Sequence, residues 1–199
     1  MTEGQNTLSI AGQNQNVGGL PVVTWGSTGD AQGSSTVLDL PSNSTAYMTA
    51  DLTTMYFGQS IKRGIRFFSG RRQVLLQDEL TGVNATTYWR MHTNATITID
   101  GNNANLTLGG QNLQVQLIDP PSGVAWQNLA PERTADAPQL QTGQEADQPN
   151  PGVSVLSLSI PASTTTTTIQ VIFNPQWSDF SSFTTPALVP LSGWSLTSH

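Results

Sequence analysis

Hydrophobic and polar residues alternate along much of this chain with a period of two. In three runs, at residues 113–117, 156–160 and 169–173, every second position is apolar and most positions between are Gln or Ser. Val74, Leu76 and Asp78 alternate in the same way with Gln and Leu. Because successive side chains of a strand point to opposite faces, these runs predict strands with one face on a core and the other toward water.

Turn signals separate the runs at short intervals. They include Gly18-Gly19, Asp100-Gly101 and Pro120-Pro121. Two hairpins are predicted, one over residues 95–108 and one over residues 61–80, because alternating segments flank a short Gly-containing loop in each. With about a dozen candidate strands and no convincing amphipathic helix, the sequence predicts an all-β, two-sheet antiparallel β-sandwich without substantial helix. A closed barrel is the alternative architecture.

The chain of 199 residues is expected to form a single β-sandwich domain over residues 1–177 and a tail over residues 178–199. Aromatic residues continue beyond the last strand, which predicts that the tail packs along the sandwich and covers an edge or face. They are Trp177, Phe180, Phe183 and Trp194. Residues 130–151, rich in proline and acidic residues, form one long irregular stretch, which is either a solvated connection or a functional loop.

Composition excludes several classes of protein. Charged residues make up 10% and the formal net charge is −6, which argues against a nucleic-acid binder. The polar strand positions are Gln, Ser and Thr rather than Lys and Glu, which accounts for the low charge without disorder. No apolar run could cross a membrane, and residues 1–5 do not resemble a signal peptide. With no Cys, two His and scattered carboxylates, we expect no metal site and no cofactor.

Five of the seven basic residues fall between Lys62 and Arg72. The planar guanidinium fork of arginine suits bidentate binding of carboxylate or sulfate, so this segment is a candidate for contact with an acidic polysaccharide. The alternative is a solvated hairpin whose cations pair with Asp78 and Glu79 on the neighbouring strand. The candidate binding residues here are Lys62, Arg66, Arg71 and Arg72.

A second candidate set lies on the segment Thr87 to His92. On a strand, Tyr88, Arg90 and His92 project from one face, while Trp89 and Met91 project from the other. Tyr can stack on a sugar, Arg can bind a uronate and His can transfer a proton, so this face is a plausible saccharide-binding set. The alternative is a half-buried strand in which a neighbour satisfies the imidazole.

Four Asn-X-Ser/Thr sequons occur in the chain. Parity directs Asn94 away from the core, and two others fall in predicted turns, so the set tolerates glycans and indicates a secreted parent. The candidate glycosylation sites are Asn43, Asn84, Asn94 and Asn105.

Three segments together resemble a known family. They are residues 62–68 (Lys-Arg-Gly-Ile-Arg-Phe-Phe), residues 70–79 (Gly-Arg-Arg-Gln-Val-Leu-Leu-Gln-Asp-Glu) and residues 89–93 (Trp-Arg-Met-His-Thr). In this order they resemble the C-terminal β-sheet domain of heparinase II/III-like polysaccharide lyases, most closely the fungal type. Weaker similarity extends over residues 6–177, including residues 46–52 and 151–175. The resemblance implies an extracellular protein whose parent family cleaves uronic-acid polysaccharides by β-elimination.

Departures from the family pattern define the expected function. The α/α toroid, which supplies most catalytic groups in the family, is not present in these residues, and Gln5 stands where the family often has His. We therefore assign no catalytic residue, and we expect a non-catalytic module that binds, or supports binding of, an acidic polysaccharide. One alternative is a structural or self-associating β-protein that forms homo-oligomers, since uncharged strands offer little protection against edge pairing. Another is part of an active lyase completed by a missing toroid domain.

Overall fold

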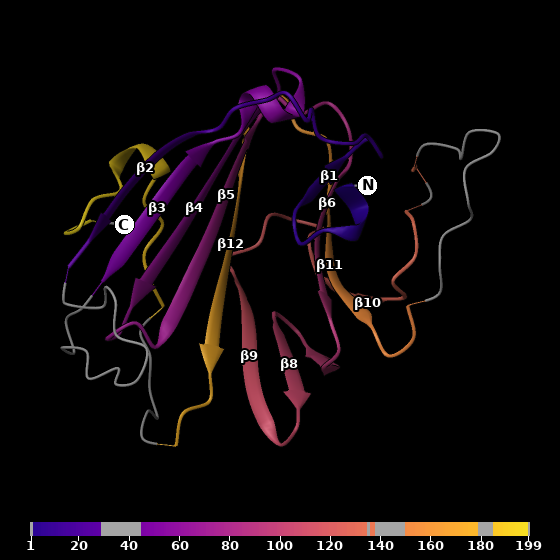
Figure 1. Ribbon diagram of the computed structural model, residues 1–199, viewed down its shortest axis with the longest axis vertical. Helices are drawn as coiled ribbons and strands as arrows, with labels where there is room; N and C mark the ends of the chain where they lie inside the picture. The colour runs from indigo at the N-terminus through magenta and orange to yellow at the C-terminus, as the bar shows by residue number, and fades with distance from the viewer. Residues whose placement is uncertain (1, 29–44, 135, 138–149, 179–184, 199) are drawn as a thin grey trace.

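The computed structural model describes residues 2–28, 45–134, 136–137, 150–178 and 185–198. In these residues the chain forms twelve β-strands in two antiparallel sheets (Figure 1). The predicted all-β sandwich is therefore confirmed, and the barrel alternative is wrong because the strands divide between two separate sheets. The helical elements within this part of the chain are three short 3-10 turns, at Thr2–Gly4 (η1), Thr53–Tyr56 (η2) and Leu191–Gly193 (η3).

The larger sheet contains eight strands in the order β2-β3-β4-β5-β12-β9-β8-β7. The chain builds it from an early group and a middle group of strands, and β12 then pairs with β5 on one side and β9 on the other. The strands are β2 (Val22–Ser27), β3 (Ala46–Asp51), β4 (Ser60–Phe68), β5 (Gln73–Thr81), β7 (Thr96–Asp100), β8 (Asn103–Leu108), β9 (Gln111–Ile118) and β12 (Thr166–Pro175).

The smaller sheet contains four strands in the order β1-β6-β11-β10. Its longer strands, β6 and β11, pair along their whole length, with Arg90 opposite Ser157. Figure 1 shows this sheet nearly edge-on, facing the larger one. The strands are β1 (Leu8–Ile10), β6 (Thr87–Thr93), β10 (Trp126–Leu129) and β11 (Ser154–Ile160).

Both predicted hairpins form. β4 and β5 are joined by the turn Ser69–Arg72, and the register places Arg63 opposite Asp78. β7 and β8 are joined through Gly101, whose φ of +57° is the left-handed conformation that a tight hairpin turn requires and that glycine adopts without strain.

The main core lies between the two sheets. Aliphatic side chains from alternating positions of β9, β11 and β12 meet there, and Trp89 contacts Trp126 edge to face at a ring-centroid separation of 5.5 Å. The fully buried members include Leu117, Leu156, Leu158, Ile160, Ile169 and Val171. These are the positions that the period-two pattern assigns to the core.

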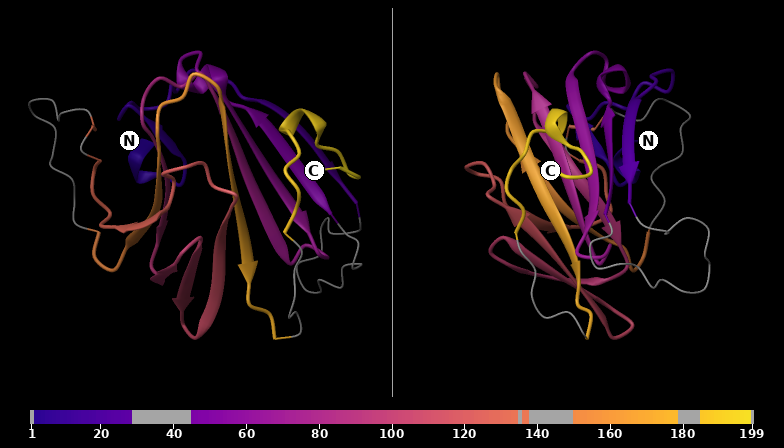
Figure 2. Two further views of the ribbon diagram at one scale, coloured as in Figure 1. Left: turned by 180° about the vertical axis from the view of Figure 1, so that it is seen from behind. Right: turned by 90° about the vertical axis from the view of Figure 1, so that its left-hand side faces the viewer.

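The outer face of the larger sheet differs from the sequence prediction. Polar positions that the alternation directs toward water are buried, because residues 185–198 lie against this face (Figure 2). Leu191 and Trp194 pack there on Leu75 and Ile172. The amides beneath satisfy one another: Gln170 Nε2 donates to Gln77 Oε1 at 2.9 Å, and Gln77 Nε2 donates to the Val189 carbonyl at the same distance. Of the expected tail, Phe180 and Phe183 lie outside the described residues.

Candidate functional site

The outer face of the smaller sheet carries a cleft of about 290 Å³. Tyr88 and Arg90 of β6 form one wall, and the segment that follows β10 forms the other. The parity of β6 places Trp89 in the main core, so its neighbours necessarily face outward. We call this cleft the arginine cleft; it is lined by Tyr88, Arg90, Leu129, Ala130, Glu132, Arg133 and Thr134.

Arg90 fixes the segment that closes the cleft. Its side chain is buried, and its Nη2 donates to the carbonyl of Glu132 at 2.7 Å. Further along the same segment, the Asp136 carbonyl lies so close to Gly12 that a Cβ at this glycine would overlap it. The segment is therefore held against the sheet at both points.

His92 lies beside Arg90 on the same face of β6. Its Nδ1 is 3.3 Å from Asn6 Oδ1, and the same oxygen accepts from the His92 backbone N–H at 2.8 Å. Partial burial, and then the positive charge of Arg90, lower the pKa of His92 below its ordinary value. The imidazole consequently favours its neutral form at neutral pH. It does not line the arginine cleft.

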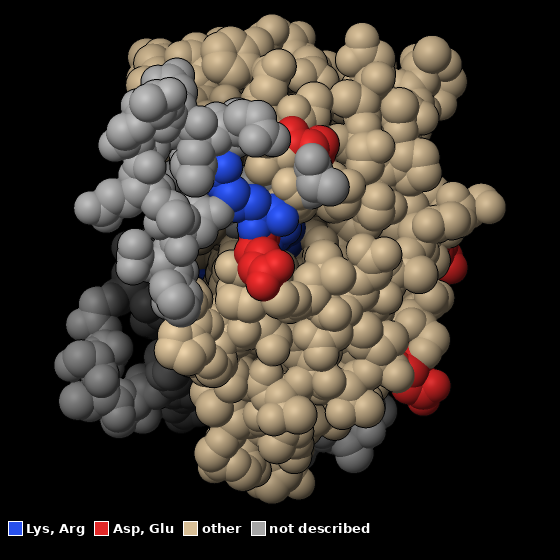
Figure 3. Space-filling view, turned by 90° about the vertical axis from the view of Figure 1, so that its right-hand side faces the viewer, with Lys and Arg blue, Asp and Glu red and all other residues tan. Residues whose placement is uncertain are grey.

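Charged side chains are sparse on the surrounding surface. Figure 3 looks onto this side of the molecule and shows basic side chains gathered between acidic ones, within a broad uncharged area. The cleft brings together two guanidinium groups, Arg90 and Arg133, and one carboxylate, Glu132, whose side chain is exposed. Among the residues that line the cleft, the two guanidinium groups therefore outnumber the carboxylate, although the whole chain carries −6.

Arg66, a predicted saccharide-binding residue, has a structural position instead. It is 4% exposed on the outer face of the larger sheet. Its guanidinium donates to the carbonyls of Ser195 at 2.6 Å, Ser198 at 2.9 Å and Leu196 at 3.2 Å. Arg66 therefore holds the C-terminal residues onto the sheet, and burial lowers its pKa.

The other cations of the β4–β5 hairpin are spread over different surroundings. Lys62 is half-buried and lies between Asp51 and Glu79 in the register of the sheet. Arg71 Nη2 donates to Ser27 Oγ and to the Thr28 carbonyl, both at 2.8 Å. Arg72 is half-buried in the same turn. The sandwich separates this hairpin from the arginine cleft, so the structure does not join the two predicted sets.

One cation of the hairpin makes the expected cross-strand pair. Arg63 donates bidentately to Asp78, with Nε–Oδ1 2.6 Å and Nη2–Oδ2 2.8 Å. This pair lies on the inner face, and Asp78 is completely buried, so it is not the solvated pair that the alternative interpretation described. Burial lowers the pKa of Arg63, but the charge and hydrogen bonds of Asp78 raise it by more.

Three of the four sequon asparagines can be located. Asn84, Asn94 and Asn105 are exposed, so all three are accessible for modification. The outward direction that parity predicts for Asn94 agrees with this exposure. Asn43 lies outside the described residues.

Sequence reasoning did not identify Arg133 as a member of the site. It lies in the long irregular stretch that follows β10, where no periodicity indicates which way a side chain points. A signal was nevertheless present, because Arg133 is the one basic residue in a stretch that otherwise carries acidic charge.

Within the described ranges, no group of three or more His, Asp or Glu residues is arranged to hold a metal ion. The same residues include no helix of the length and apolarity needed to span a bilayer. The side chains that line the arginine cleft offer hydrogen bonding and charge pairing, together with contact on the Tyr88 ring.

No family model matches the chain, and no curated protein matches it. Among solved structures, the fold is similar to the crystal structure of heparinase III, with a TM-score of 0.56 and 14% sequence identity. The similarity covers 85% of this chain and 23% of heparinase III, so the chain spans about a quarter of that protein's length. At this identity the likeness concerns the fold, and it confirms that the β-sandwich is built like part of a heparinase.

Proposed function

We propose that this chain is a polysaccharide-lyase-related module that binds an acidic polysaccharide at the arginine cleft and does not cleave it alone. The observation that carries the proposal is that two guanidinium groups and a tyrosine line one cleft, on a surface where the described residues include few other charges. The heparinase-like fold supports a polysaccharide as the ligand. The finer assignment, a C-terminal domain of fungal type acting outside the cell, belongs to the same proposal.

The two arginines have different roles in the proposed complex. Arg133 lines the cleft and is half-buried, and the planar fork of a guanidinium suits bidentate pairing with a uronate carboxylate or a sulfate. Arg90 is buried and holds the Glu132 carbonyl, so it mainly shapes the cleft and adds positive charge. The half-buried ring of Tyr88 offers a surface on which a sugar can pack. Because the attraction is electrostatic, we expect affinity to fall as ionic strength rises.

Calorimetric titration of the full chain with glucuronan, alginate and heparin fragments tests this proposal. Arg133→Gln is expected to weaken binding about tenfold, which corresponds to a loss of about 1.4 kcal/mol for one charge-assisted contact. Arg72→Gln removes a cation from the β4–β5 turn of the other sheet and should bind as the parent does. Equal weakening in both variants would contradict the assignment of the arginine cleft as the binding site. If none of the three glycans binds, the proposed glycan-binding function is refuted.

Catalysis is measured on the same samples. Release of unsaturated uronate, detected by its ultraviolet absorbance, would contradict the non-catalytic assignment and favour the alternative of an active lyase. We expect no release from any of the three glycans when the chain is incubated alone.

A specific observation favours self-association as a second candidate function. β2 is an edge strand without a charged residue, and three of its apolar side chains are exposed: Val22 by 71%, Val23 by 46% and Trp25 by 68%. Met48 and Phe67 continue the apolar surface across the neighbouring strands. An exposed, uncharged edge can pair with another strand, including that of a second copy.

Light scattering over a range of protein concentrations tests this second candidate. The mass should increase with concentration for the parent chain, and Trp25→Lys should remain monomeric because a charge on the edge opposes pairing. A monomeric parent at every concentration would eliminate self-association without affecting the glycan proposal.

A further inference from the structure

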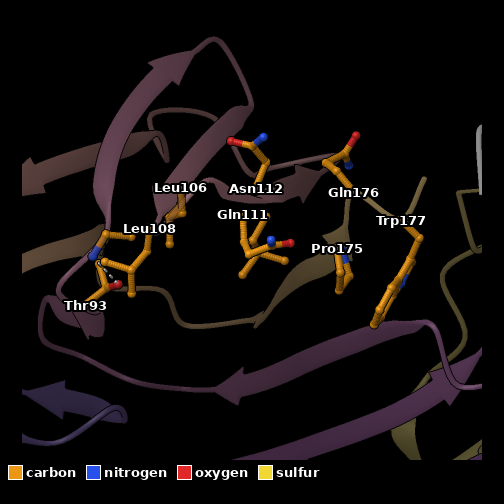
Figure 4. A pocket seen from close by; sticks show the side chains of 10 residues that line it. Thr93, Leu106, Leu108, Gln111, Asn112, Pro175, Gln176 and Trp177 are labelled. Carbon is orange, nitrogen blue, oxygen red and sulfur yellow. Dashed lines mark hydrogen bonds between the residues drawn. The ribbon is translucent and has the colours of Figure 1, made fainter. Parts of the chain in front are cut away.

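A second hollow, of about 490 Å³, opens at the end of the sandwich where β6 and β8 end and β9 begins. It lies at the margin of the main core and shares no residue with the arginine cleft. Figure 4 shows Leu106 and Leu108 on one side and Pro175 and Trp177 on the other, with Gln111 between them and the Asn112 side chain pointing away. We call it the tryptophan groove.

Trp177 is held in place without being buried. Its Nε1 donates to the Arg72 carbonyl at 3.2 Å, yet the residue remains 50% exposed. The hydrogen bond satisfies the polar atom of the indole and limits rotation of the ring. The remaining exposed area is apolar and can contact a ligand with little further loss of side-chain entropy.

An amide group stands beside the apolar walls. Gln111 is exposed at the groove and lies opposite Leu108 in the register of β8 and β9, so its side chain shares the face of the leucines. The side chain of the next residue, Asn112, points to the other face, where its Oδ1 accepts from Thr107 Oγ1 at 2.8 Å. Apolar walls with a few polar groups that can orient a ligand are the usual construction of a small-molecule site.

None of the residues lining the groove is charged. If a uronate or sulfate bound here, the anion would lose its hydrating water and gain no positively charged partner, which is unfavourable. A neutral sugar combines an apolar C–H face, which can pack on an indole, with hydroxyl groups at its edge, which can pair with amides. We propose that the tryptophan groove binds a neutral saccharide unit that stacks on Trp177 and hydrogen-bonds to Gln111.

This inference goes beyond the function proposed for the arginine cleft, because it concerns a different site and a ligand without charge. A chain with both sites would bind a polysaccharide in which neutral and acidic residues alternate, or two polysaccharides at once.

Nuclear magnetic resonance of the five indole N–H groups tests the proposal directly. The full chain is titrated with the neutral hexasaccharides of cellulose, xylan and mannan. At least one should shift the Trp177 signal, identified by its loss in Trp177→Phe. Affinity for that hexasaccharide should fall at least tenfold in Trp177→Ala, remain within about threefold in Trp177→Phe, and be independent of salt.

Trp25→Ala is the matched control, since Trp25 is also exposed, by 68% against 50% for Trp177, and lies on the edge strand β2. It should bind as the parent does, and Arg133→Gln should also leave neutral binding unchanged, which separates this proposal from the arginine cleft. The proposal is overturned if no neutral hexasaccharide binds, if Trp177→Ala retains full affinity while folded, or if Trp25→Ala loses as much. Binding of an aliphatic probe such as decanol, with no sugar bound, would also overturn it.

Discussion

The buried ion pair between Arg63 and Asp78 gives the sharpest test of the architecture. Replacing Arg63 by Met keeps most of the side-chain volume but removes the charge and both hydrogen bonds. Asp78 is 0% exposed, so its carboxylate would remain in the core without a counterion. Breaking a buried pair on one side costs roughly 3–5 kcal/mol.

Urea unfolding, followed by circular dichroism, measures this loss as a change in the free energy of unfolding. At about 2–4 °C per kcal/mol for a chain of this size, the melting temperature should fall by roughly 6–20 °C. Lys62→Met is the matched control, because Lys62 is the preceding residue on the opposite face and should change stability by less than about 1 kcal/mol.

A double variant separates the contribution of the ion pair to the free energy of unfolding from the penalty of leaving one buried charge unpaired. Arg63→Met with Asp78→Leu should be more stable than Arg63→Met, because neither buried charge remains. The burial of the Asp78 carboxylate would be contradicted if Arg63→Met lowers the free energy of unfolding by less than about 1 kcal/mol. It would also be contradicted if the double variant is the least stable of the variants.

Three other predictions follow from the positions described. Gly64→Ala should loosen the C-terminal residues, since its Cβ would approach Trp194 Cζ3 to 2.6 Å. Overpacking costs about 1–3 kcal/mol, and the Trp194 fluorescence should shift to longer wavelength. Gly4→Ala is the control, because Gly4 is exposed and its Cβ would meet no atom within 4 Å. Arg66→Met should destabilise the chain without weakening acidic-glycan binding, and a calorimetric loss of affinity at unchanged fold would contradict its structural role. The pKa of His92 is lower in the folded chain than in the unfolded chain, so the imidazole of the unfolded chain is protonated first as the pH falls. The free energy of unfolding should therefore rise with pH until the pH reaches the ordinary histidine pKa near 6.5. A nuclear magnetic resonance titration of His92 in the folded chain with a midpoint at or above that pKa would contradict this prediction.

The inward side chains of the fold could be predicted from the sequence, because burial in the main core follows the period of two. Leu156 and Leu158 face the core as the alternation requires, and the turn at Gly101 follows from local chemistry. The outer face of the larger sheet could not be predicted. Gln77 looks like a solvent-facing residue, but it meets Gln170, which is far away in the sequence, and both lie beneath the C-terminal residues.

The candidate site was predictable to a similar extent. Strand parity placed Tyr88 and Arg90 on one face, and the structure finds them in one cleft. The clustering of basic residues also suggested that Arg66 would contact a ligand. The C-terminal residues cover its position in the sheet, and no local sequence pattern indicates this. Arg133 and Trp177 lie in irregular segments, where only three-dimensional packing decides what a side chain contacts.

The place of β12 in the larger sheet has a consequence for how the protein is made. β12 lies between β5 and β9, so the two groups of strands that precede it cannot join until residues 166–175 have been synthesised. Until then, β5 and β9 each present an open edge to solvent or to another nascent chain. Sheets that depend on such distant pairings fold slowly, and a chain cut before residue 166 would give two half-sheets with open edges rather than a smaller stable protein.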